Sequence, residues 1–190
     1  MSHDKAEVIQ RTCEALEHGD LDEASAILAR DYPFTLEPVG GRRYSELEAI
    51  RVFVRDGFTD RYSANRLVFP GALRVLSLNV PSALPFQKNW KMTETHPAYW
   101  ELFPTIDHVV PVARGGPDTE ANWVTTSMLR NSAKGNWTLD ELGWHLLPPH
   151  NLKEWDGLLG WFRRYVERQS QIFKDPYIRR WYEAARKVAV

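Results

Sequence analysis

The stretch between residues 105 and 135 constrains the fold more than any other part of the chain, because it combines strand-like and helical signals in a fixed order. Short β-prone runs and a glycine-containing loop come first, and a capped helical run comes last. We therefore expect four elements: a strand over 105–110 that ends before Pro111, a loop over 113–121, a short strand over 123–126 opened by Asn122, and a helix that runs from Ser127 through Lys134 and ends at Gly135.

Helical patterns dominate the rest of the chain. At the N-terminus Gly19 separates two acidic helices, Asp20 caps the second, and Ser45 with Glu48 forms a capping box that opens a third. The predicted helices cover residues 4–18, 21–30, 45–58, 152–173 and 176–187. We expect a loop at VGGRR (39–43), a short hairpin at RYSANRLVF (61–69), an irregular proline-containing connector over 79–98 and a loop after Trp144. Residues 71–78 are apolar and fit either a helix or a strand.

These patterns predict an α+β protein, mainly helical, with an embedded strand–loop–strand–helix unit and a short hairpin. We divide the chain into an N-terminal helical region (1–58), a central core (59–147) and C-terminal helices (148–190), and we expect the three to pack as one compact unit.

Composition narrows the class of protein. Cys13 is the only cysteine, which excludes an internal disulfide framework and a cysteine-based zinc site. Hydrophobic residues make up 43% of the chain, enough for a packed core. No apolar run in the sequence is long enough for a membrane span or typical of a signal peptide, so we expect a cytoplasmic protein.

The charge is unevenly distributed. The net charge is −1, but residues 1–38 are acidic, whereas residues 39–134 and 153–190 carry an excess of basic side chains. This polarity permits a phosphate-binding face, although solvated helix faces would give similar blocks.

Polar residues recur at defined spacings within the predicted unit. Asp107 and His108 end the first strand, Asn122 follows His108 by 14 residues, and Asn131 follows Asn122 by 9. The segment opens as DHxxPxxxGG and closes as NxxKG, with Lys134 as the lysine. This pattern resembles the HNH (ββα-metal) family of endonucleases, in a variant with Asn in the third position and without the zinc-binding CxxC pairs. The resemblance covers only about 35 of the 190 residues.

The resemblance implies a phosphodiester hydrolase that acts on DNA and leaves 5′-phosphate and 3′-hydroxyl ends. His108 would be the general base, because imidazole accepts a proton near neutral pH. Asp107 and Asn131 would offer two oxygens to one divalent cation, and a twist at the strand end must bring Asp107 and His108 to the same side. Hard oxygen ligands favour Mg²⁺, with Mn²⁺ as a substitute, and no structural zinc is expected. Asn122 would hold the loop and His108 in place.

Other residues are candidates for substrate contact. Lys134, Arg114 and Arg130 could bind phosphate, but a solvated surface role fits them equally well. His96 could approach the site from the connector, whereas an ordinary structural histidine is the simpler interpretation of both His96 and His145.

A homodimer would suit a double-strand cut, and RNA remains an alternative substrate. The alternative functions are a nucleic-acid-binding module that does not cleave and a helical interaction protein in which the motif is incidental.

Overall fold

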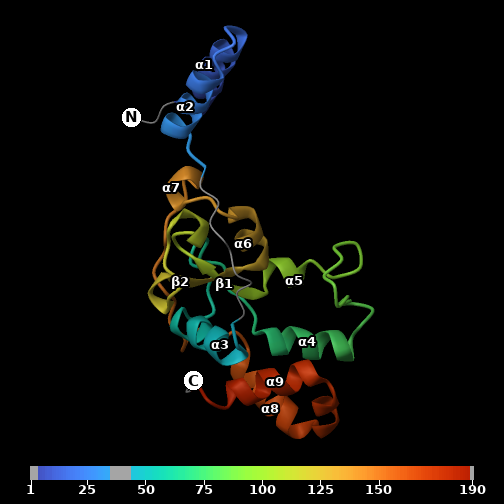
Figure 1. Ribbon diagram of the computed structural model, residues 1–190. Coiled ribbons are helices and arrows are strands. Elements are labelled where there is room, and N and C mark those ends of the chain that lie inside the picture. The colour runs from blue at the N-terminus through green and yellow to red at the C-terminus, as the bar shows by residue number, and fades with distance from the viewer. Residues whose placement is uncertain (1–3, 35–43, 189–190) are drawn as a thin grey trace. The chain divides into compact units, whose positions relative to one another are not determined.

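The computed structural model describes residues 4–34 and 44–188 and divides the chain into two compact units, Met1–Val39 and Gly40–Val190 (Figure 1). The loop expected over residues 39–43 lies outside the described residues. The first unit contains α1 (Lys5–Glu17) and α2 (Leu21–Asp31). The second contains α3 (Glu46–Arg55), α4 (Pro70–Asn79), α5 (Ala98–Glu101), β1 (Pro104–His108), β2 (Trp123–Ser127), α6 (Met128–Lys134), α7 (Leu139–Leu142), α8 (Leu159–Arg168) and α9 (Pro176–Ala185), with short 3₁₀ turns at Val112–Arg114, Glu120–Asn122 and Ser170–Lys174.

The first unit is the helical hairpin that the sequence predicts. The Asp4 carboxylate caps α1 and the Asp20 carboxylate caps α2, each by accepting a backbone N–H of the first turn. Gly19 joins the two helices in the left-handed region, at φ +74°. Val8 and Ile27 are buried in the hairpin. The two helices expected in this region are thus confirmed.

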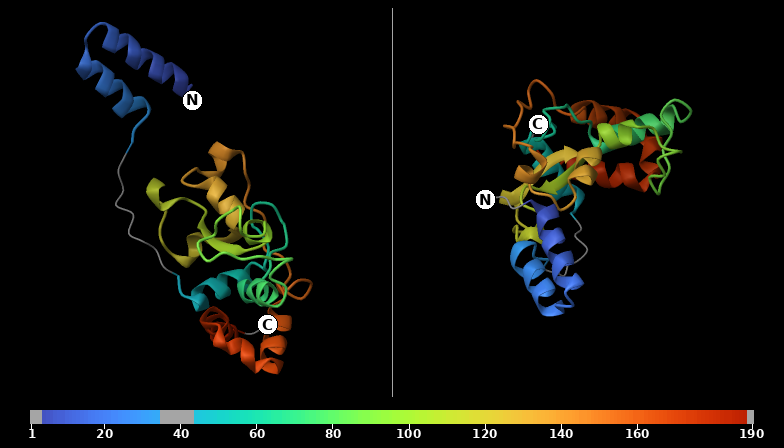
Figure 2. Two further views of the ribbon diagram at one scale, coloured as in Figure 1. Left: turned by 90° about the vertical axis from the view of Figure 1, so that its right-hand side faces the viewer. Right: turned by 90° about the horizontal axis from the view of Figure 1, so that it is seen from above.

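The second unit has a hydrophobic core rich in aromatic rings. The helices α8 and α9 cover one side of α3 and α4, and the two-stranded sheet lies on the other side of α3 (Figures 1 and 2). Phe69 lies at the centre of this packing, with its ring centroid 4.9 Å from Phe162 and 5.3 Å from Trp181. The helix α3 packs on β2 and α9, so it belongs to the second unit. The division expected from the sequence, which places residues 1–58 in one N-terminal region, is wrong at this helix.

The sheet is an antiparallel pair whose outer edge is closed by buried aspartates. In β1 and β2, Pro104 faces Ser127 and His108 faces Trp123. On the edge of β2 away from β1, the Asp56 carboxylate accepts the backbone N–H of Thr125 at 2.8 Å, and Asp60 accepts that of Ser127 at 3.0 Å. The two carboxylates take the backbone donors that a further strand would otherwise pair with, and they fix the sheet against the segment that follows α3.

Two regions differ from expectation, and the structure resolves a third that the sequence left open. The predicted hairpin at 61–69 is a tight turn closed by one antiparallel bridge, between Thr59 and Arg66. The ambiguous apolar run forms α4. The helix expected from residue 152 begins only at Leu159, because Gly157 and Leu158 both adopt left-handed backbone conformations. A Cβ on Gly157 would lie 2.4 Å from the Phe58 ring, so this close approach requires glycine.

The connector is irregular up to α5, as predicted. Across residues 4–34 and 44–188, no helix combines the length and the apolar character needed to cross a bilayer.

We predict that Asp56→Ala destabilises the fold by about 3–5 kcal/mol. Asp56 is fully buried, and its carboxylate lies 2.7 Å from the Arg61 guanidinium and 3.0 Å from that of Arg55, in addition to the Thr125 bond. Removing it leaves the partly buried Arg61 guanidinium and the buried backbone N–H of Thr125 without their acceptor. Urea denaturation followed by circular dichroism measures the effect. The exposed Glu101→Ala serves as the control, with an expected change below about 0.5 kcal/mol, and equal midpoints for the two variants would contradict the prediction.

Candidate active site

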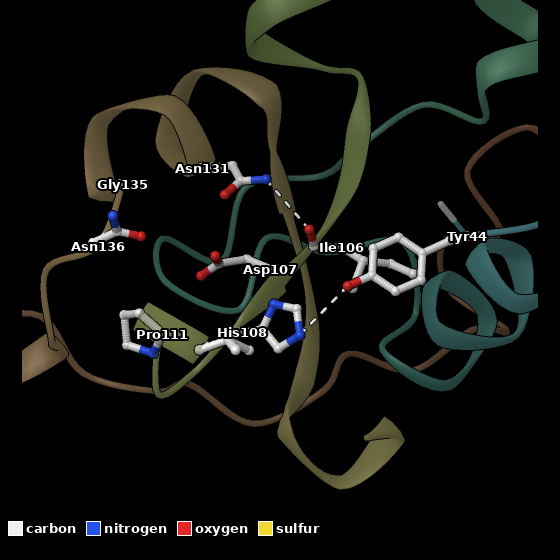
Figure 3. A pocket seen from close by; sticks show the side chains of 9 residues that line it. Tyr44, Ile106, Asp107, His108, Pro111, Asn131, Gly135 and Asn136 are labelled. Carbon is white, nitrogen blue, oxygen red and sulfur yellow. Dashed lines mark hydrogen bonds between the residues drawn. The ribbon is translucent and has the colours of Figure 1, made fainter. Parts of the chain in front are cut away.

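The residues expected to carry the chemistry line one cavity at the end of β1. Asp107 and His108 come from the last two positions of β1, and Asn131 comes from α6. All three line a cavity of about 260 Å³, together with Tyr44, Ile106, Pro111, Val112, Gly135 and Asn136 (Figure 3). Neighbouring residues of a regular strand face opposite sides. Because β1 ends at His108, where the chain bends, both side chains reach the same cavity.

One oxygen of Asp107 is held by two buried donors. The Tyr62 hydroxyl donates to Asp107 Oδ2 at 2.6 Å, and Lys134 Nζ lies 3.0 Å from the same oxygen. Burial, reinforced by the negative charge of Asp107, raises the pKa of the Tyr62 phenol, so Tyr62 stays protonated and acts as a donor. Lys134 also donates to the backbone carbonyl of His108 at 2.7 Å. The carboxylate is therefore fixed in orientation with its other oxygen, Oδ1, left without a hydrogen-bond donor among the described residues.

Lys134 is fully buried and does not reach solvent. This burial contradicts the solvated surface role that its sequence position allowed, whereas the phosphate contact stays an untested prediction. Its ammonium instead joins α6 to the end of β1 through Asp107 and the His108 carbonyl. Lys134 is thus a positioning residue for the carboxylate that precedes His108.

The Asn131 amide presents its oxygen to the cavity. Its Nδ2 donates weakly to Ile106 O at 3.3 Å and to Thr105 Oγ1 at 3.4 Å, which sets the orientation of the amide. Figure 3 shows the Asn131 oxygen on the opposite side, facing Asp107 and Asn136. The cavity therefore receives one carboxylate oxygen and one amide oxygen from two different elements.

The His108 imidazole is anchored through a single ring nitrogen. Its Nε2 lies 2.8 Å from Asp118 Oδ1, 3.1 Å from Trp123 Nε1 and 3.4 Å from the Tyr44 hydroxyl. His108 is only 7% exposed, and it lines the cavity. Figure 3 shows the other ring nitrogen, Nδ1, on the side of the ring that faces Asp107.

Asn122 braces the loop and does not line the cavity. Its amide accepts the backbone N–H of Val110 at 3.0 Å and donates to the carbonyls of Val110 at 2.8 Å and Pro117 at 2.9 Å. Gly116 lies so close to this contact that a Cβ there would be 1.9 Å from the Val110 oxygen. Asn122 thus holds the turn that follows His108, which is the structural role expected for it.

The three candidate substrate residues lie outside the cavity lining. Arg114 donates to the Asn136 carbonyl at 3.3 Å and approaches Glu141 at 3.4 Å. Arg130 packs over the Trp144 ring, 5.1 Å from its centroid. His96 Nδ1 accepts the backbone N–H of Ala98 at the start of α5. His96 is therefore engaged in a local turn and is not brought to the site.

Sequence reasoning missed several residues that shape the site. Tyr62 precedes Asp107 by 45 residues, and nothing in the local pattern relates the two. Asp118 lies in the expected loop, but an aspartate in a glycine-containing loop is also typical of a simple turn. The other residues missed are Tyr44 and Asn136, which line the cavity.

The donor set fits a hard divalent cation. In the described parts of the chain, no group of three or more His, Cys, Asp or Glu side chains is arranged to hold a metal ion. Mg²⁺ keeps several waters and uses one or two protein oxygens with substrate phosphate. The open oxygens of Asp107 and Asn131, on one cavity wide enough for waters and a phosphate group, match that requirement.

Comparison of the chain with protein-family models, with curated proteins and with solved structures gave no match. The site must therefore be interpreted from its own geometry.

We predict that Lys134→Met lowers the free energy of unfolding by about 3–5 kcal/mol. The substitution keeps the volume of the aliphatic stem but leaves the Asp107 carboxylate buried without its cation. Urea denaturation of this variant beside Lys153→Met, which alters an exposed lysine, measures the effect. A Lys134→Met protein as stable as the control would show that the buried pair does not form.

Proposed function

We propose that the chain is a metal-dependent endonuclease that hydrolyses phosphodiester bonds of DNA. The observation that carries the proposal is that a carboxylate, an imidazole and an amide, from the end of β1 and from α6, line one cavity. The strand–loop–strand–helix order and the spacing of these residues resemble the HNH endonucleases, and the geometry supports the same assignment of roles.

Asp107 Oδ1 and Asn131 Oδ1 would hold one divalent cation, with Mg²⁺ as the expected ion and Mn²⁺ as a substitute. When bound, the cation supplies electrostatic stabilisation of charge on the phosphate and on the leaving 3′ oxygen. Tyr62 and Lys134 keep the Asp107 carboxylate in place through its second oxygen. The two ligands sit on a strand and a helix and not on a mobile loop, which suits a preorganised site.

His108 acts as the general base. Its cavity-facing nitrogen accepts a proton from water, and the resulting hydroxide oxygen forms a bond to phosphorus while the bond from phosphorus to the 3′ oxygen breaks. The leaving oxygen takes the electron pair of that bond and is protonated by solvent. The ends produced are a 5′-phosphate and a 3′-hydroxyl.

DNA is the proposed substrate, and RNA is the alternative. A cleavage assay with both nucleic acids distinguishes the two. A homodimer would place two such sites on the two strands of a duplex. Arg114, whose side chain donates to the carbonyl of the cavity-lining Asn136, is the residue we propose to contact a flanking phosphate.

We predict that His108→Ala lowers the rate of plasmid nicking by about 10²- to 10⁴-fold, because general-base catalysis contributes roughly that much. The assay uses supercoiled plasmid with Mg²⁺ or Mn²⁺, and chelation with EDTA is expected to abolish cleavage by the wild type. His150→Ala, a surface histidine, is the matched control and should cut at the wild-type rate.

Cleavage by His108→Ala at the wild-type rate would reject the catalytic assignment. Binding of DNA by the wild type without any cleavage would instead favour a module that binds nucleic acid, and the absence of both would favour an interaction protein. Single-stranded RNA and DNA of one sequence, labelled at the 5′ end, decide the substrate class.

We predict that Asn131→Ala weakens Mn²⁺ binding by roughly tenfold or more, since it removes one of two protein oxygens. Isothermal titration calorimetry of the free protein measures the affinity. Asn131 makes only long hydrogen bonds, so the variant is expected to stay folded. The exposed Asn89→Ala is the control, and equal Mn²⁺ affinity in the two variants would remove Asn131 from the cation site.

A further inference from the structure

The contacts of His108 Nε2 define which ring nitrogen carries the proton. A carboxylate can only accept hydrogen bonds, and an indole N–H can only donate. Nε2 lies 2.8 Å from Asp118 Oδ1, so a proton on Nε2 makes this contact a hydrogen bond, whereas two lone pairs at that distance would repel.

The indole of Trp123 fits the same arrangement. Its Nε1 lies 3.0 Å from Asp118 Oδ1 and 3.1 Å from His108 Nε2. The indole N–H has the geometry to donate to either atom. With the proton on Nε2 it donates to Asp118 alone, which then accepts from both side chains. The Tyr44 hydroxyl, 3.4 Å from each of Nε2 and Asp118 Oδ1, is at the limit of a hydrogen bond to either.

The lone pair of the imidazole is then on Nδ1. This nitrogen has no hydrogen-bond partner within residues 4–34 and 44–188, and Figure 3 shows it on the side of the ring that faces Asp107. The ring is held at its edges as well, since the Tyr44 and Trp123 rings meet edge to face with centroids 4.9 Å apart and each lies 6.4 Å from the His108 ring.

We propose that Asp118 is a positioning residue that holds His108 in the tautomer with the proton on Nε2, so that Nδ1 accepts the proton from water. Trp123 fixes the acceptor oxygen of Asp118 by donating to it. When Nδ1 takes the proton, the water O–H bond breaks, an N–H bond forms, and the positive imidazolium faces the Asp118 carboxylate. The catalytic consequence rests on the proposed nuclease function, whereas the tautomer does not.

The test compares Asp118→Ala, Asp118→Asn and the control Glu120→Ala, which removes an exposed carboxylate from the same loop. Long-range ¹⁵N–¹H NMR of the metal-free proteins, at a pH where the imidazole is neutral, reports the tautomer of His108. We expect a pyrrole-type Nε2 and a pyridine-type Nδ1 in the wild type and in Glu120→Ala. In Asp118→Ala the protonation should shift towards Nδ1.

Asp118→Asn separates hydrogen bonding from charge. The Trp123 N–H needs an oxygen at the position of Oδ1, so the amide oxygen is expected there and can still accept from Nε2. This variant should keep the wild-type tautomer. In plasmid nicking, Asp118→Ala should lower kcat by roughly 10- to 100-fold at unchanged KM. The reduction in kcat should be smaller for Asp118→Asn.

Two results would overturn the proposal: a wild-type His108 protonated on Nδ1, or an Asp118→Ala protein whose His108 keeps the wild-type tautomer. A tautomer that follows Asp118 in a protein that cuts no nucleic acid would support the positioning role and reject the nuclease. Cleavage by the wild type, together with a tautomer that is the same in Asp118→Ala, would support the nuclease and reject the positioning role.

Discussion

The site depends on one buried contact, the Lys134 ammonium between the Asp107 carboxylate and the His108 carbonyl. A buried ion pair adds little net stability, because desolvation offsets most of the Coulombic attraction. Its effect is on geometry, since neither charge can move away without being left unpaired. Because Asn131 lies three residues before Lys134, on the same face of α6, anchoring the lysine also places the Asn131 amide beside Asp107. Two of the elements that line the cavity, α6 and the end of β1, are thus fixed to each other.

A second set of buried charges supports the sheet from its other edge. A two-stranded sheet is marginal by itself, and β1 and β2 are only five residues long. Asp56 and Asp60 take the outward N–H groups of β2, and the aromatic core packs behind α3. The short sheet is therefore held by α3 and the segment after it on one side and by α6 on the other. The side chains proposed to be catalytic extend from elements that are fixed at both edges, and a preorganised site requires such support.

The local part of this structure could be predicted from sequence, and the non-local part could not. Ser45, with its capping-box partner, and Ser127 act on residues within one turn, so their roles follow from the pattern. The first C-terminal helix was predicted too long because its start is set by Gly157, which packs against Phe58 nearly a hundred residues earlier. Tyr62 and Asp118 could not be assigned to the site for the same reason. Tertiary packing decides which residues they contact, and the periodicity of the sequence carries no information about that packing.

The occupied oxygen of Asp107 also bears on how the proposed cation would bind. Lys134 already compensates the carboxylate charge, and Tyr62 shares the same oxygen. If Asp107 and Asn131 hold a cation as proposed, they offer it one oxygen each and almost no net negative charge. A doubly charged ion in such a site takes most of its electrostatic stabilisation from the phosphate of the substrate, so binding of the cation and of the nucleic acid must strengthen each other by the same factor. The buried lysine would thus couple the loading of the site to the presence of a phosphodiester.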